Sequence, residues 1–226
     1  MQTPSALVLA TVALLTGGTL FAAQEKETVP AAPAVDEAAI VQAQLPSYPL
    51  TTCPITGEKL TDKAVNVVAE GRLVRVCCEK CVATVKASPA ESIAKVDAGV
   101  IAAQKAAYPL TTCPITGETL DENAVDVVTG TKLVRTCCKR CAIAVKKDAT
   151  KALAAVDAGW IEAGKKTYKV DVCPVSGEKL GSMGEPVDYL YGTRLVRLCC
   201  KGCLKQMRSD GAAVVAKLDK LAAAAK

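Results

Sequence analysis

The chain has 226 residues, of which 23% are charged and only 3% aromatic, and its formal net charge is +5. It contains no histidine. This excludes a Ser-His or Cys-His nucleophile pair, a histidine general base and any histidine-ligated metal site. Lysine and arginine are scattered without a long basic run or an aromatic platform, so we do not expect nucleic-acid binding.

The chain begins with an apolar run over residues 6–23 that carries no charged side chain. Such a run is typical of a secretory signal, so we predict a signal peptide over residues 1–23 and export to the periplasm or outside the cell. The alternative is an uncleaved leader, which would then be the attachment to a membrane; its shortness and its paired glycines count against it. The run holds no cysteine, which excludes lipid attachment through a cysteine at the cleavage site.

Residues 24–35 are rich in alanine, proline and charge, and they predict a flexible tether. We expect ordered structure to begin at Val35-Asp36 with a helix. The same pattern returns at Val96-Asp97 and Val156-Asp157, and Leu218-Asp219 begins a fourth, truncated copy. A short helix is therefore expected before each of three repeated units, with one more helix closing the array.

The twelve cysteines fall into three sets of four, with none left over. In each set one cysteine lies in a Cys-Pro turn and three form a Cys-Cys-x-x-Cys run, and the first cysteines recur 60 residues apart. This internal repetition predicts three domains joined by helices, over residues 36–106, 107–166 and 167–226. Units of this size bury little core, so a metal or disulfides are expected to stabilise them. The cysteines are Cys53, Cys77, Cys78 and Cys81; Cys113, Cys137, Cys138 and Cys141; and Cys173, Cys199, Cys200 and Cys203.

Each unit shows the same succession of local signals. A tyrosine stands five residues before the first cysteine and is expected to pack on the turn that follows. In that turn, Cys53-Pro54-Ile55-Thr56-Gly57 in the first unit, proline and glycine leave backbone N–H groups free to point at a sulfur. Residues 64–68 and 72–76 then predict a β-hairpin around Glu70-Gly71, and the return strand delivers Cys77.

A short helix is expected from Val82 to Ala87, after the last cysteine of the first unit. Ser88, Pro89 and Glu91 then have the spacing of a capping box that starts the next helix, and Asp148 and Ser209 or Asp210 occupy the equivalent place in the other units. The predicted fold class is therefore α+β, with three tandem small treble-clef-like units, each made of a Cys-Pro turn, a hairpin and a short helix, joined by connecting helices.

This arrangement would bring the sulfurs of a unit together, because the hairpin folds the chain back and the turn then faces the helix N-terminus. Helix N–H groups and nearby cations stabilise thiolates there. The cations are either part of this chemistry or ordinary solvated surface; they are Lys80, Lys139, Arg140, Lys201, Arg75, Arg135 and Arg197. Adjacent residues in a strand point to opposite sides, so it is open whether the second cysteine of each pair is the fourth ligand, a replacement or a free thiol.

The spacing resembles the YHS/TRASH-type heavy-metal-binding fingers, in which one cysteine is followed about twenty residues later by Cys-x3-Cys. The resemblance covers roughly residues 48–90, 108–150 and 168–211, and it implies a treble-clef-like module used in metal trafficking, resistance or sensing. The family pattern maps onto Cys53, Cys77 and Cys81 and their counterparts. This chain departs from it by a slightly longer gap, by a first cysteine that precedes proline, and by the additional Cys78, Cys138 and Cys200.

We therefore expect an exported, non-catalytic protein that binds metal ions through three thiolate sites and that acts with a metal-transfer partner. Four thiolates favour Zn²⁺, whereas three or fewer favour Cu⁺ or a soft heavy metal such as mercury. Three alternatives stay open. One is a secreted module stapled by disulfides without metal, and another is a thiol–disulfide oxidoreductase that uses Cys78-x-x-Cys81. The last is a structural array in which zinc only stabilises a surface for another protein.

Overall fold

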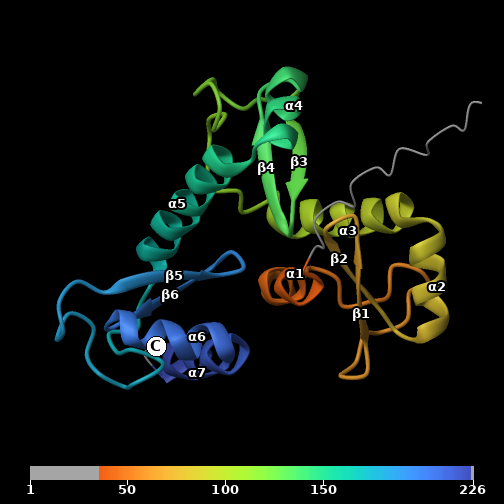
Figure 1. Cartoon of the computed structure of the whole chain (residues 1–226). Helices are drawn as coiled ribbons and strands as arrows, with labels where there is room; N and C mark the ends of the chain where they lie inside the picture. Colours follow the sequence, from red (N-terminus) through yellow and green to blue (C-terminus); the bar gives the residue numbers. More distant parts are fainter. Residues whose placement is uncertain (1–35, 225–226) are drawn as a thin grey trace, which may run out of the picture. The chain divides into compact units, whose positions relative to one another are not determined.

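The computed structural model describes residues 36–224, so the predicted signal peptide and tether lie outside the described residues. Three antiparallel hairpins succeed one another along the chain, and each is followed by helices (Figure 1). The cysteine clusters lie where each hairpin meets its helix, so the predicted α+β fold class is confirmed. Within residues 36–224 no helix is both long and apolar enough to cross a bilayer.

The elements repeat in the order hairpin, short helix, long helix, with α1 (Glu37–Gln44) and a 3-10 turn (Leu45–Ser47) before the first hairpin. The first unit contains β1 (Val65–Ala69), β2 (Arg72–Val76), α2 (Glu79–Ala87) and α3 (Pro89–Gln104). The second contains β3 (Val125–Thr129), β4 (Lys132–Thr136), α4 (Lys139–Lys147) and α5 (Thr150–Thr167). The third contains β5 (Val187–Tyr191), β6 (Arg194–Leu198), a 3-10 turn (Lys201–Cys203), α6 (Leu204–Ser209) and α7 (Gly211–Ala224).

The hairpins close through two-residue turns whose geometry follows from glycine. In the first hairpin Glu70 and Gly71 both have positive φ, 50° and 73°, which is the backbone of a type I′ turn. The predicted turn at Glu70-Gly71 is thus confirmed, with β1 starting one residue later than expected. In the other hairpins glycine comes first, at Gly130 and Gly192, and the following threonine keeps an ordinary φ.

One expectation about a helix start was wrong, and the other was confirmed in position but not in its capping hydrogen bond. The short helix begins at Glu79 rather than at Val82, because Cys78 has an extended backbone (φ −158°, ψ 168°) and serves as the N-cap. Cys81 therefore lies in the first helical turn. Ser88 is the N-cap of α3, but its side chain makes no capping hydrogen bond, and the hydroxyl of Ser92 donates to its carbonyl instead.

In the second unit the N-cap lies one residue beyond the predicted Asp148, whereas in the third unit the long helix begins directly after the predicted Ser209 or Asp210. In the second unit the N-cap of α5 is Ala149, and the carboxylate of Asp148 accepts from the N–H of Thr150. In the third unit α7 begins at Gly211, after the short helix α6.

The repeated Val-Asp pairs hold each long helix against the hairpin that precedes it. The apolar residue of each pair is buried, and Val96 packs with Val74 of β2 and Val85 of α2. The aspartate forms an ion pair with the first residue of the return strand: Asp97 with Arg72, Asp157 with Lys132 and Asp219 with Arg194. The repeat that first indicated a helix thus marks the contact between helix and hairpin.

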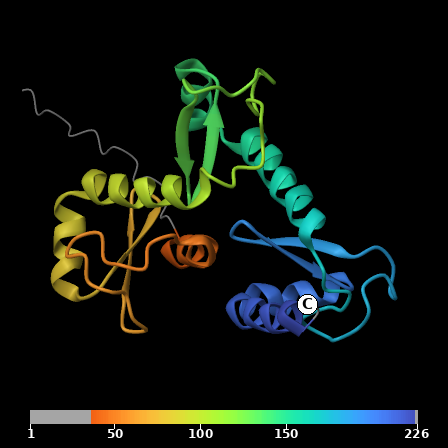
Figure 2. The same cartoon turned by 180° about the vertical axis from the view of Figure 1, so that it is seen from behind.

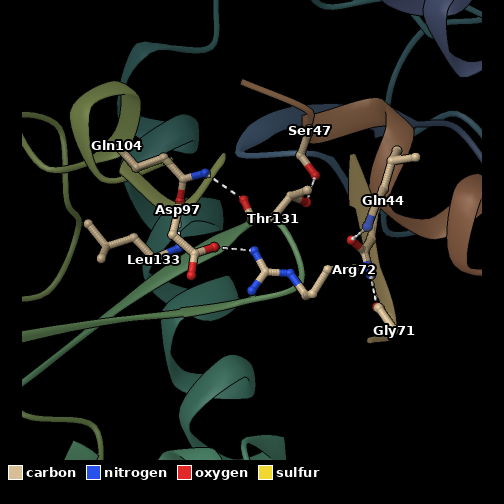
Figure 3. Close-up of polar contacts among 9 residues, drawn as sticks. Gln44, Ser47, Gly71, Arg72, Asp97, Gln104, Thr131 and Leu133 are labelled. Atoms are coloured by element: carbon tan, nitrogen blue, oxygen red, sulfur yellow. Dashed lines mark hydrogen bonds and ion pairs between the residues drawn. The ribbon is translucent and has the colours of Figure 1, made fainter. Parts of the chain in front are cut away.

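The other end of α3 contacts the next hairpin, so α3 belongs to two units at once. Helix α3 contacts strand β2 of the first hairpin and strands β3 and β4 of the second (Figures 1 and 2). The buried Gln104 donates to the carbonyl of Thr131 over 2.7 Å and accepts from the N–H of Leu133 over 2.9 Å (Figure 3). Gln44 of α1 makes the same pair of bonds to Gly71 and Leu73, each 2.9 Å long.

In the third unit this glutamine is replaced by direct packing. Gly164 of α5 takes the corresponding position, and a Cβ placed there would lie 2.6 Å from the Cβ of Leu195. Glycine is therefore needed for the close approach of α5 to β6. A further polar contact joins the hydroxyls of Ser47 and Thr131, so the segment after α1 also contacts the second hairpin (Figure 3).

Replacing Gln104 with alanine should destabilise the chain by about 1–3 kcal/mol, because the buried N–H of Leu133 and carbonyl of Thr131 lose their partner. Chemical denaturation followed by circular dichroism measures the free energy of unfolding. Gln42→Ala is the matched control, since Gln42 is an exposed helical glutamine. Equal effects of the two substitutions would show that the hydrogen bonds of Gln104 do not support the second hairpin.

Candidate metal centres

The Cys-Pro turn has the same backbone hydrogen bonds in every unit. In the first unit the N–H of Cys53 donates to the carbonyl of Glu58 over 2.7 Å, and the N–H of Gly57 donates to the carbonyl of Cys53 over 2.8 Å. Gly57 has a φ of 77°, which glycine adopts readily. The corresponding bonds at Cys113 and Cys173 have the same lengths. The repeated Cys-Pro-x-x-Gly sequence therefore produces one rigid shape three times.

A tyrosine hydroxyl holds the return strand of each hairpin next to this turn. The hydroxyl of Tyr48 accepts a hydrogen bond from the N–H of Arg75 over 3.0 Å, two residues before Cys77. Tyr108 and Tyr168 do the same for Arg135 and Arg197, over 3.0 and 3.1 Å. The ring of Tyr48 also packs against the buried cluster that contains Cys53. Sequence reasoning expected the packing and missed the hydrogen bond to the strand.

Three sulfurs from distant positions meet in each unit. The Sγ atoms of Cys53, Cys77 and Cys81 all lie within 4.8 Å of one another. The same holds for Cys113, Cys137 and Cys141, and for Cys173, Cys199 and Cys203. In each unit the turn supplies the first sulfur, the end of the return strand the second and the start of the helix the third. We call these three sets the triads.

The second cysteine of each pair lies beside its triad. In the first unit the Sγ of Cys78 is 3.8 Å from the Sγ atoms of both Cys77 and Cys81. Cys78 is not part of the triad, whose Sγ atoms all lie within 4.8 Å of one another. Since its Sγ is close to those of Cys77 and Cys81, it must lie more than 4.8 Å from the Sγ of Cys53. Cys78 and Cys138 are exposed and Cys200 is partly buried, whereas the first and last cysteines of every triad are buried.

The sulfur spacings fit a shared metal ion. Four Sγ–Sγ distances within the triads are 3.7–3.8 Å; they join Cys77 and Cys81, Cys137 and Cys141, Cys199 and Cys203, and Cys173 and Cys203. A tetrahedral ion with metal–sulfur bonds of about 2.3 Å needs sulfur–sulfur edges of about 3.8 Å. A disulfide needs about 2.05 Å. All twelve cysteines are free and lie in the described residues, so the donor set suits a thiophilic cation.

The first thiol of each unit is prepared to lose its proton. Burial alone would raise the pKa of Cys53, but the backbone N–H groups of Thr56 and Cys77 lower it to about 6. Burial opposes ionisation in the other units too, but the N–H groups of Cys137 and Thr116 lower the pKa of Cys113 to about 6. Those of Ser176 and Cys199 lower the pKa of Cys173 to about 7. The sequence-based expectation that the turn directs N–H groups at a sulfur accounts for this effect.

The other sulfurs differ in their ionisation because their surroundings differ. Burial and the neighbouring sulfurs raise the pKa of Cys81 to about 12. The N–H of Cys81 at the start of α2 and the adjacent sulfur of Cys77 lower the pKa of the exposed Cys78. A bound cation would allow the remaining thiols to lose their protons, so metal binding is expected to release protons.

A hydroxyl group also faces the triad cysteine at the end of each return strand, and sequence reasoning missed this contact. The Oγ1 of Thr56 lies 3.5 Å from the Sγ of Cys77, and Thr116 lies equally far from Cys137. In the third unit Ser176 takes this place at 3.3 Å from Cys199. The repeated threonine or serine before the glycine of each turn was the available signal.

The strand arginines, which the sequence left open as partners of the sulfurs or as solvated surface, form hydrogen bonds across their hairpins. Arg135 bonds Asp126 and Arg197 bonds Asp188, each over 2.9 Å, across the hairpin. Each of these bonds joins the two strands of a hairpin through the Nε of its arginine. Lys80, Lys139, Arg140 and Lys201 are exposed next to the clusters.

Comparison of the chain with protein-family models, with curated proteins and with solved structures finds no match. The class of protein is therefore described from the geometry of the site. The chain contains three repeated units, each with a β-hairpin and a cysteine triad that could hold a metal ion.

Replacing Tyr108 with phenylalanine should lower the free energy of unfolding by about 1–2 kcal/mol, because the N–H of Arg135 loses its acceptor. Urea denaturation measures the change. Tyr191→Phe is the control, since within residues 36–224 the hydroxyl of Tyr191 makes no hydrogen bond. If both variants unfold at the same urea concentration as the parent protein, the tyrosine does not hold the return strand.

Proposed function

We propose that this is an exported, non-catalytic metal-binding protein that captures zinc or a soft heavy-metal ion, such as copper(I) or mercury(II), at three thiolate sites. The observation that supports it most is the threefold meeting of cysteines from the turn, the strand end and the helix start, with spacings that fit a metal–sulfur polyhedron. The likeness to the YHS/TRASH-type fingers points the same way, towards metal trafficking or resistance.

Capture follows from ordinary thiol chemistry. The thiol of Cys53 and its counterparts Cys113 and Cys173 would bind first as thiolates, because turn N–H groups already favour that form. Binding of the ion then displaces the protons of the two remaining thiols. The return strand and the helix start become fixed to the turn, so each unit is stabilised by its ion.

Each chain is expected to bind three ions, which native mass spectrometry with and without chelator would measure after purification under reducing conditions. Cys53→Ser should reduce the number to two, and the combined Cys53→Ser, Cys113→Ser, Cys173→Ser variant should bind none. A metal-free protein without reactive thiols, lighter by two hydrogens for each bridge, would instead support the disulfide-stapled module.

A second function, thiol–disulfide exchange, is favoured by one observation. Cys78 is exposed with a lowered pKa at a helix N-terminus, and the buried Cys81 lies 3.8 Å away, as in redox pairs. However, Cys77 lies equally close to both, so a third sulfur faces the pair. Catalysed reduction of insulin disulfides by the metal-free chain would favour the oxidoreductase, whereas no activity above that of free thiols would favour metal capture.

A further inference from the structure

The first unit contains two overlapping sets of three sulfurs. The inner set is the triad of Cys53, Cys77 and Cys81. The outer set is Cys77, Cys78 and Cys81, with sulfur–sulfur distances of 3.8, 3.8 and 3.7 Å. The two sets share the edge between Cys77 and Cys81 and differ only in whether Cys53 or Cys78 completes them.

The two sulfurs that distinguish the sets differ in access to solvent. Cys53 is 2% exposed and lies among buried apolar side chains, whereas Cys78 is exposed at the surface. Cys78 is the extended N-cap residue of α2, and its Sγ lies 3.8 Å from that of Cys77 but on the exposed side of the cluster. Cys138 and Cys200 occupy the same backbone position, with φ of −155° and −159°.

We propose that the inner set holds the ion and that the exposed cysteine is the exchange ligand through which the ion enters and leaves. This inference rests on the proposed metal-binding function. The exposed cysteines, Cys78, Cys138 and Cys200, are then transfer residues rather than permanent fourth ligands.

The transfer step is a substitution of one sulfur for another. A bond forms between the ion and the Sγ of Cys78, and the bond between the ion and the Sγ of Cys53 breaks. The proton of the Cys78 thiol passes through solvent to the Cys53 thiolate, so the total charge and the oxidation state of the ion do not change. Cys77 and Cys81 stay bound throughout, and an incoming thiol can then replace the exposed sulfur.

The third unit should exchange more slowly than the first two. Cys199 is 1% exposed, whereas its counterparts Cys77 and Cys137 are only partly buried, and Cys200 is less exposed than Cys78. The buried Met207 also packs with the cysteines of this unit, where the first unit has the smaller Val85. The exchange ligand of the third unit is thus the least accessible of the three.

The test uses the full chain loaded with Zn²⁺ and a variant that carries Cys78→Ser, Cys138→Ser and Cys200→Ser together. Serine is a good N-cap, so the helix starts should be preserved. Native mass spectrometry should still find three ions, and transfer of Zn²⁺ to an excess of a chromogenic thiol chelator should slow by about tenfold or more. The parent protein should release two ions faster than the third, and Cys173→Ser should abolish the slow phase.

The outcomes separate the two proposals. If the parent protein binds no Zn²⁺, the proposed function itself fails. If the parent binds three ions and the triple serine variant binds fewer, the exposed cysteines are permanent ligands and the exchange role is wrong. Equal transfer rates for the parent and the triple serine variant would also overturn the exchange role. A Cys78→Ala variant serves as a second check: its circular dichroism spectrum should match that of the parent, so that a slower transfer does not come from unfolding.

Discussion

Each cysteine cluster depends on one hydrogen bond from a return-strand N–H to a tyrosine hydroxyl. In the first unit this bond runs from Arg75 to Tyr48, and the other two units have the same bond. The tyrosine enters with the segment just before the Cys-Pro turn, and the N–H belongs to the return strand just before the paired cysteines. One bond therefore fixes the distance between the two parts of the chain that supply sulfurs. The hairpin alone would reverse the chain direction without fixing how far the paired cysteines lie from the Cys-Pro turn.

The three clusters are connected through side chains rather than through a continuous sheet. Asp97 holds α3 to the hairpin of the first unit, and seven residues later Gln104 holds the same helix to the hairpin of the second. Lys105 adds an ion pair of 2.8 Å to Asp126 of that hairpin. A helix with two such ends transmits order from one unit to the next, so metal binding in one unit should stabilise its neighbour.

The sequence predicted what depends on local pattern. Repeated cysteines, the Glu70-Gly71 turn and the Val-Asp pairs predicted three hairpin units with helices between them, because each signal lies within a few residues of the structure it specifies. The sequence did not reveal the glutamine contacts, since Gln44 and Gly71 are far apart along the chain and no pattern links them. It also misplaced the start of α2, because the extended backbone of Cys78 depends on the packing of its neighbours.

Under the proposed function, the exposure of the sulfurs addresses a conflict between holding a metal ion and releasing it. A site that surrounds its ion with buried thiolates holds it well but offers no route for a competing ligand, whereas an exposed site exchanges its ion and holds it poorly. In the first unit, doubling one cysteine places a buried and an exposed sulfur on either side of the common Cys77–Cys81 edge. Affinity and exchange can then be set by different residues, Cys53 and Cys78, and can change independently between repeats. In the third unit Cys199 is buried and Cys200 is partly buried, so the proposed exchange role would shift that balance towards retention there.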